Sequence, residues 1–276
     1  MVQKSDNPPL IVLCAFVDVM TLSPLSYPPS LEALDALAPA DWQAVTQAEP
    51  TEALAWMQEA AAVGQRDAQV ILGQWLLDGH GTARQPVEAL AWFLKAARQG
   101  QAMGMNMAGR CFENGWGGEV DSFIAANWYR QAANKGLDAG MYNYANLLST
   151  GRGVGKNPGE AFAWYRRAAG LGHAKSMTKL GYFYEDGRVV AQDAAAAFAW
   201  FERGARGGDF RGKFNYAGML AARGQLCDAL HWLEQVPLTA TPGFQRLAGA
   251  QLLQSPHPEF RALGQHMLDR AGRYPA

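Results

Sequence analysis

The stretch EALAWFLKAARQG at residues 88–100 decides the fold, because the chain carries nearly the same stretch, EAFAWYRRAAGLG, at residues 160–172. Its apolar residues recur at offsets of three, four and seven, which is the period of an α-helix that buries one face. The tryptophan of both stretches belongs to a column with a constant spacing of 36 residues, and a glycine stands eight positions after each tryptophan. This regularity predicts an internal repeat that packs in the same way each time. The column consists of Trp56, Trp92, Trp128, Trp164 and Trp200.

A second helical segment follows each tryptophan helix, and it is clearest in HAKSMTKLGYFYEDG at residues 173–187. Turn-rich stretches such as GRGVGKNP at residues 151–158 then lead to the next tryptophan helix. Each period therefore predicts a helix, a short turn, a second helix and a longer turn. We expect the tryptophans in the core, and small residues where two helices cross closely. The small residues are Gly73, Gly109, Ala145, Gly181 and Ala217.

This frame resembles the Sel1-like repeat, a 36-residue relative of the tetratricopeptide repeat. It reads A-x-x-x-L-G-x-x-Y-x-x-G, then G-x-G-V, then A-x-x-W-Y-x-x-A-A-x-x-G, and residues 151–187 match it most fully. The resemblance implies an all-α fold, a right-handed α/α superhelix of about five helical hairpins with atypical capping helices. It also implies a bacterial, non-catalytic scaffold or adaptor that binds other proteins.

We expect one elongated domain with atypical ends. It comprises an N-terminal segment at residues 1–29, capping helices at 30–51, the repeat solenoid at 52–236 and C-terminal capping helices at 237–276. The spacing from Trp200 to Trp232 falls to 32, which predicts a shortened last repeat. The terminal helices are expected at residues 30–48, with a break near Pro39, and at residues 242–254 and 257–271.

Several interpretations of residues 1–29 stay open. The segment packs on the first helices or is disordered, or it is an over-long start ahead of a true start at Met20, or it is an export signal. Its apolar run at residues 10–17 is too short to cross a membrane and makes a poor export signal.

Composition and charge narrow the classes of partner. The chain has 24 basic and 25 acidic residues and no block of Lys or Arg, so we expect neither nucleic acid nor a membrane as a partner. Cys14, Cys111 and Cys227 form no recurring pair, which favours reduced thiols in the cytoplasm. A periplasmic or exported location is the alternative if the N-terminal segment is a signal. We expect a monomer or a weak homo-oligomer.

No motif in the sequence indicates catalysis, a metal or a cofactor. The five histidines are scattered without metal-ligand spacing. The Gly-rich stretch at residues 151–158 lacks the Ser or Thr that a phosphate-binding loop needs after its lysine. No G-x-S-x-G elbow is present. We therefore expect no enzyme activity, and an enzyme or enzyme subunit is a less favoured alternative.

The positions that vary within the repeat are the better candidates for function. In a right-handed stack of helical hairpins, the first helix of each pair lines the concave side. Asn side chains there can hydrogen-bond the backbone of an extended peptide, and Lys or Arg can bind a carboxylate. We expect a peptide or protein ligand at these positions; the alternative is that they are solvated helix residues. The candidate residues are Gln74, Arg110, Asn143, Asn146, Lys179, Tyr182 and Asn215.

Overall fold

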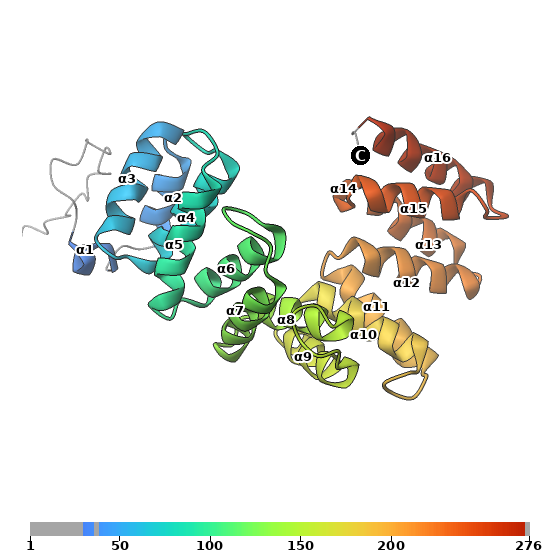
Figure 1. Cartoon of the computed structure of the whole chain (residues 1–276). Helices are drawn as coiled ribbons and strands as arrows, with labels where there is room; N and C mark the ends of the chain where they lie inside the picture. The colour runs from blue at the N-terminus through green and yellow to red at the C-terminus, as the bar shows by residue number, and fades with distance from the viewer. Residues whose placement is uncertain (1–29, 36–38, 274–276) are drawn as a thin grey trace, which may run out of the picture.

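The computed structural model of the protein describes residues 30–35 and 39–273, and every regular element in that part is an α-helix. Figure 1 shows the helices following one another in chain order along a curved array, from α1 at one end to α16 at the other. From α2 to α14 each helix packs on the next helix in the chain, as expected for a solenoid. The protein is an all-α, right-handed α/α solenoid, as the sequence predicts.

Two kinds of helix alternate along the array. The Trp helices carry the tryptophan column, and the A helices lie between them. The helices α3 to α12 are each 13 residues long, whereas α13 has only nine, which confirms the shortened last repeat. The Trp helices are α3 (Pro50–Ala62), α5 (Pro86–Arg98), α7 (Ser122–Asn134), α9 (Pro158–Gly170), α11 (Ala194–Arg206) and α13 (Leu226–Glu234). The A helices are α4 (Arg66–Asp78), α6 (Ala102–Asn114), α8 (Asp138–Thr150), α10 (Ala174–Asp186) and α12 (Phe210–Ala222).

Shorter or frameless helices flank the repeats at both ends. At the front they are α1 (Leu31–Asp35) and α2 (Pro39–Gln47), and at the back α14 (Val236–Thr239), α15 (Pro242–Leu252) and α16 (Pro258–Gly272). The helices predicted near residues 30–48, 242–254 and 257–271 are thus confirmed. The division of the chain into four segments stays a prediction, and residues 1–29, with Met20 and Cys14, lie outside the described residues.

The glycine eight positions after each tryptophan is required by the turn into the next A helix. At these positions the backbone φ is positive, a conformation that residues with a side chain rarely adopt. This geometry explains why the glycine recurs in every repeat. The values are 102° at Gly64, 82° at Gly100, 90° at Gly136, 94° at Gly172 and 93° at Gly208.

The centre of the core lies one residue beyond the tryptophan column. The residue that follows each tryptophan is at most 1% exposed in all five repeats, whereas the tryptophans themselves are half-buried. The tryptophans pack against the core clusters from the side. The prediction that the tryptophans form the core is therefore wrong by one position, because the residue after each tryptophan is the fully buried one. The fully buried column is Met57, Phe93, Tyr129, Tyr165 and Phe201.

Basic side chains cover several of the half-buried tryptophans. Lys95 Nζ lies 3.7 Å from the ring centroid of Trp92, and the guanidinium carbon of Arg167 lies 4.3 Å from that of Trp164. In both pairs the cation stands three positions later on the same helix, so it lies over the same face. Cation–π contacts therefore cover the exposed side of Trp92 and of Trp164.

The small residues of the A helices lie where the buried column crosses. A Cβ built on Gly73 would come within 2.6 Å of the Phe93 ring, and one on Gly109 within 2.7 Å of the Tyr129 ring. Ala145 and Ala217 hold the corresponding positions with no exposed surface. These contacts confirm that small residues permit the close crossing.

The A helices form the inner side of the curve. The pairs α4–α6, α6–α8 and α10–α12 lie against each other directly. Side chains of consecutive A helices also hydrogen-bond, for example Asn143 Nδ2 to Asn106 Oδ1 at 2.9 Å. In a curved stack, neighbouring repeats approach most closely on the concave side. The structure therefore supports the assignment of the A helices to that side.

Candidate functional site

The seven residues predicted for a ligand patch all lie on A helices and are all half-buried. We call the surface that they share the A-helix face. It is defined by positions 67, 71, 74 and 78 of α4 and by the corresponding positions, 36 residues apart, of the other A helices. The predicted residues on it are Gln74 on α4, Arg110 on α6, Asn143 and Asn146 on α8, Lys179 and Tyr182 on α10, and Asn215 on α12.

Two of the three asparagines join one A helix to the next. Asn143 Nδ2 donates to Asn106 Oδ1 at 2.9 Å, which links α8 to α6. Asn215 Nδ2 donates to the Tyr182 hydroxyl at 2.6 Å, which links α12 to α10. These amides therefore stabilise the stacking of repeats, a role that the sequence does not reveal because the partners are more than 30 positions apart.

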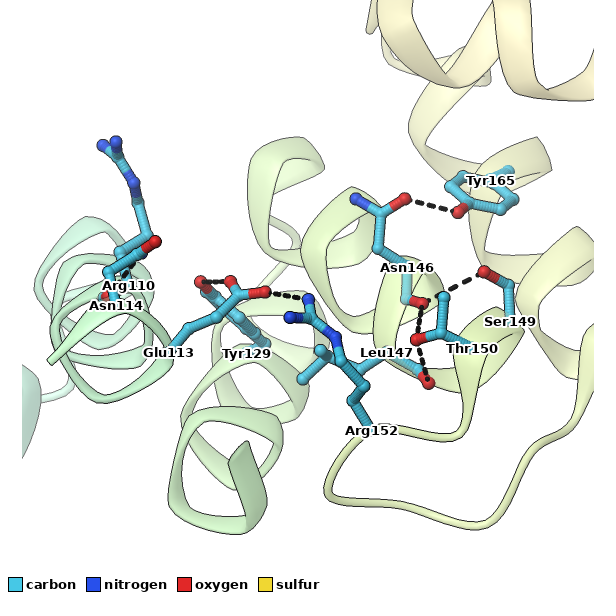
Figure 2. A network of polar contacts seen from close by, with 10 residues as sticks. All are labelled: Arg110, Glu113, Asn114, Tyr129, Asn146, Leu147, Ser149, Thr150, Arg152 and Tyr165. Carbon is cyan, nitrogen blue, oxygen red and sulfur yellow. Dashed lines mark hydrogen bonds and ion pairs between the residues drawn. The ribbon is translucent and has the colours of Figure 1, made fainter. Parts of the chain in front are cut away.

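Asn146 anchors Tyr165, the buried tyrosine of the Trp helix α9, as Figure 2 shows. The Tyr165 hydroxyl donates to Asn146 Oδ1 at 2.7 Å. Burial raises the pKa of Tyr165, so its phenol keeps its proton. Ser149 and Thr150 donate their hydroxyls to the Asn146 carbonyl, which secures the end of α8. Asn146 is thus part of the packing as well as of the A-helix face.

A carboxylate that the sequence analysis missed lies on the same side. The Tyr129 hydroxyl donates to Glu113 Oε2 at 2.6 Å, and Arg152, from the loop after α8, forms an ion pair with Glu113 Oε1 (Figure 2). Burial, and then the hydrogen bond to Glu113, raises the pKa of Tyr129. The sequence contains one signal for this contact. Tyr129 stands where two other repeats have phenylalanine, and a buried hydroxyl needs a hydrogen-bond partner.

Gln74 and Arg110 make only local contacts. Gln74 Nε2 donates to Asp78 Oδ2 at 2.7 Å, one turn along α4. Arg110 contacts the Met107 sulfur at 3.6 Å, and its guanidinium carbon lies 5.1 Å from the Trp116 ring centroid. The structure therefore does not bring these two residues together with those of α8 and α10.

A cavity of about 560 Å³ opens at the step from α8 to α10. It collects Lys179 and Tyr182 from the predicted patch, and Tyr165, which bonds Asn146, forms part of its wall. Phenols, a hydroxyl, charged groups and an aromatic ring face the same space, which suits a polar ligand with an apolar part. The lining residues are Ser149, Tyr165, Lys179, Tyr182, Phe183, Glu185, Asp186 and Arg188.

The ammonium group of Lys179 has no partner in this cavity, within the part of the chain that the structure describes. The residue is half-buried, and among the described residues its ammonium has neither a hydrogen bond nor an ion pair. Burial, and then the charge of Arg211, lowers the pKa of Lys179, while Asp209 acts in the opposite direction. A half-buried ammonium without a partner gains from an acceptor that a ligand brings.

The cavity also contains Glu185. Its counterpart in an earlier repeat accepts a hydrogen bond and forms an ion pair. Glu185 corresponds to Glu113, but Phe201 corresponds to Tyr129 and has no hydroxyl to donate. Asp186, its neighbour, pairs with Arg188 at 2.8 Å. In the described part of the chain no ion pair satisfies the Glu185 carboxylate, so the cavity presents both a cation and an anion.

The buried thiol of Cys111 is a poor candidate for a nucleophile. Burial raises the pKa of Cys111 to about 11, which disfavours the reactive thiolate. Within residues 30–35 and 39–273, no group of three His, Cys, Asp or Glu side chains is placed to hold a metal ion. In the same part of the chain, no helix combines the length and hydrophobicity needed to cross a bilayer.

The chain is similar to several solved solenoids. A Sel1 repeat protein from Oxalobacter formigenes is 24% identical, with a TM-score of 0.72 over 85% of this chain and 98% of that one. The protective antigen c5321 of uropathogenic Escherichia coli, described as an SLR fold, is 23% identical with a TM-score of 0.62, over 85% of this chain and 53% of that one. The immunity protein Pa5087 from Pseudomonas aeruginosa is 18% identical with a TM-score of 0.53, over 76% and 82%. These likenesses show the fold.

No curated protein matches the chain. The family model of the Sel1 repeat, by contrast, matches five consecutive segments, at residues 43–64, 66–101, 102–137, 138–173 and 174–209. Together these segments cover more than half of the chain, and the last four each comprise one A helix and the Trp helix after it. The chain therefore belongs to the Sel1 repeat family.

Proposed function

We propose that the protein is a non-catalytic scaffold that binds a peptide segment of another protein along the A-helix face, centred on the cavity between α8 and α10. Sel1 repeat proteins are generally protein-interaction scaffolds. The observation that carries the proposal is Lys179, a half-buried ammonium without a partner in a cavity of the A-helix face. Such a group is more costly to leave unpaired than to hydrogen-bond.

The asparagines support the proposal less directly than the sequence suggests. Because Asn143 and Asn215 are bound to neighbouring helices, a ligand would have to share their remaining donors and acceptors. Removing Asn143 would also break the bond between α8 and α6. A clean test therefore changes Lys179 and leaves the amides in place.

The test selects binders from a library of random peptides displayed on phage and maps the bound peptide by hydrogen exchange. We expect protection to appear on α8, α10 and α12, and Lys179→Ala to weaken binding. Arg166→Ala is the matched control, since it removes one exposed charge from α9, the Trp helix that precedes α10. The double variant Asn143→Ala, Lys179→Ala should weaken binding further while its circular dichroism stays helical. Failure to select any peptide, or protection confined to the Trp helices, would reject the proposal.

We infer a cytoplasmic location from the cysteine pattern, with an exported, envelope-associated protein as the alternative. Cys111 and Cys227 are free thiols. The N-terminal mass of the protein isolated from its source cell distinguishes the two, because export by a cleaved signal removes the N-terminal segment. We further propose a monomer or weak homo-oligomer, which light scattering over a range of concentrations tests.

A further inference from the structure

Charge is distributed unevenly along the A-helix face. The first A helix, α4, presents Asp67 and Asp78, whereas α10 and α12 present Lys175, Lys179 and Arg211 together with one acid, Asp186, which pairs with Arg188. The two aspartates of α4 accept hydrogen bonds, from Gln101 at 3.0 Å and Gln74 at 2.7 Å. Among the described residues, the three cations have no carboxylate within ion-pair distance. Lys175, Lys179 and Arg211 therefore lack ion-pair partners within the described part of the chain.

Arg211 is held in place by aromatic rings rather than by an acid. Its guanidinium carbon lies 4.6 Å from the centroid of the Phe210 ring and 5.4 Å from that of the Phe244 ring. These two rings pack on each other with centroids 4.9 Å apart. Stacking on rings fixes the plane of a guanidinium while its N–H edges stay available, and a planar fork of donors matches a carboxylate.

Lys179 and Arg211 stand on α10 and α12, which lie against each other, and the charge of Arg211 disfavours that of Lys179. The lowered pKa of Lys179 comes from burial first and from Arg211 second. A carboxylate placed between the two cations would relieve both effects. His173, the other basic group here, adds little positive charge at neutral pH because burial lowers its pKa.

Two acids lie near these cations without pairing with them: Glu185 lines the same cavity as Lys179, and Asp209 is already used by the fold. Asp209 is 5% exposed, precedes α12, and its Oδ2 accepts from the Gly212 N–H at 3.1 Å. Because it is buried at the start of a helix, Asp209 cannot reach out to neutralise the face.

A second cavity, of about 310 Å³, opens farther along α12 and is lined mainly by apolar groups. Phe214 and Gly218 of α12 and Phe260 of α16 are among its walls. Gly218 stands on the A-helix face where Tyr182 stands one repeat earlier, so the absent side chain leaves the space open. Arg211 and Gly218 are seven residues apart, roughly 10 Å along the helix. An extended peptide crosses that distance in about three residues.

We infer that the A-helix face of α10 and α12, together with the adjoining cavity beside Gly218, binds an acidic protein segment. A side-chain carboxylate of the segment contacts Lys179 and Arg211, and a large apolar side chain about three residues away fills the cavity beside Gly218. This inference rests on the proposed function and specifies the chemistry of its ligand.

The test uses end-blocked, fluorescein-labelled peptides of roughly ten residues in fluorescence-anisotropy titrations. The reference peptide has a Gly and Ser background, two adjacent Glu residues and a Leu three positions later. One companion carries Gln in place of Glu, and a second carries Ser in place of Leu. A third companion has Gln for Glu and a free C-terminal carboxylate, which separates side-chain carboxylates from a chain terminus.

Wild-type protein should bind the acidic peptide about tenfold more tightly than the Gln peptide. The variant Lys179→Gln, Arg211→Gln should lose this preference, while Arg166→Gln keeps it. Gly218→Phe should fill the cavity and remove the preference for Leu over Ser, whereas Gly218→Ala should retain most of it. A Cβ at position 218 has no atom within 4 Å, so both variants should fold.

Equal binding of the acidic and Gln peptides, no binding of the acidic peptide, or an unchanged preference in the double-charge variant would overturn the inference. A preference that follows the free C-terminus instead of the Glu residues would overturn it too. If phage-selected peptides still protect α8 and α10 in any of these cases, the proposed function stands and only its ligand chemistry is wrong. If no peptide binds in either experiment, the proposed function fails as well.

Discussion

The close crossing of α10 and α11 makes a quantitative prediction for Gly181→Ala. A Cβ at position 181 would lie 2.6 Å from both Cδ1 and Cε1 of Phe201 and 3.0 Å from its Cγ. Phe201 has no exposed surface, so its ring cannot turn away into solvent. Overpacking of this kind costs about 1–3 kcal/mol, and replacing a helical glycine by alanine returns about 0.5–1 kcal/mol. We therefore expect a net loss of about 1–2 kcal/mol, and a larger loss for Gly181→Leu.

Gly218→Ala is the matched control, because it makes the same exchange in the next A helix where nothing opposes the new methyl group. We expect this variant to gain about 0.5–1 kcal/mol from helix propensity. Thermal unfolding followed by circular dichroism measures both, at about 2–4 °C for each kcal/mol in a protein of this size class. In the Gly181→Ala variant, hydrogen exchange should show the loss of stability in α10 and α11, since each repeat contacts only its neighbours.

A second change tests whether the contact itself is responsible. Phe201→Leu should cost stability alone, but it should cost less in the Gly181→Ala background because the smaller side chain accommodates the methyl group. If Gly181→Ala and Gly218→Ala shift the unfolding midpoint equally, or if the double variant shows no coupling, the explanation of the small residues by close crossing is wrong.

Two other predictions concern Gly117 and Cys111. Gly117 has a φ of 84°, and a Cβ there would overlap the Pro86 carbonyl oxygen; Gly117→Ala should therefore cost at least about 2 kcal/mol and speed hydrogen exchange in the loop before α7. Wild-type exchange rates in that variant would contradict this. Burial raises the pKa of Cys111 from 9.0 to about 11, so the thiol form is favoured in the folded state: this stabilisation is complete below about pH 9 and is lost as the pH rises through about 11. In the native protein at pH 8, iodoacetamide should label the exposed Cys227 before Cys111. Cys111→Ala should reduce the loss of stability at alkaline pH. Equal labelling of Cys111 and Cys227 would contradict the burial of Cys111.

The sequence predicts the helices well because their determinants are local. The glycines after the tryptophans and the apolar period within each helix act over one or two turns, and the 36-residue spacing can be read directly along the chain. They identify the repeat family and the right-handed solenoid. They also predict the shortened last repeat, since a spacing of 32 leaves no room for the usual loop.

The packing of side chains is less predictable. Trp92 and Phe93 are neighbours on one helix and differ by about 100° around its axis. The sequence selects the conspicuous tryptophan for the core, whereas the structure buries Phe93 fully, with Gly73 of α4 against its ring, and Trp92 only in part. That difference depends on the angle at which two hairpins stack, which no local pattern fixes.

The candidate site shows the same division. Repeat spacing places Lys179, Tyr182 and the asparagines on the correct helices and on one face. It does not show that Asn143 and Asn215 are engaged by adjacent helices while Lys179 has no partner. The Glu113 network joins residues from α6, α7 and the loop after α8, and it too requires the stacked repeats.

The sequence by itself determined the repeat, the helix boundaries and the face on which variable residues lie, because each depends on periodicity within one chain segment. Only the tertiary structure decided which of those residues are satisfied and where cavities open. Hydrogen-bond partners more than 30 positions apart meet only after the hairpins stack, and a cavity such as the one beside Gly218 exists only between helices that have packed.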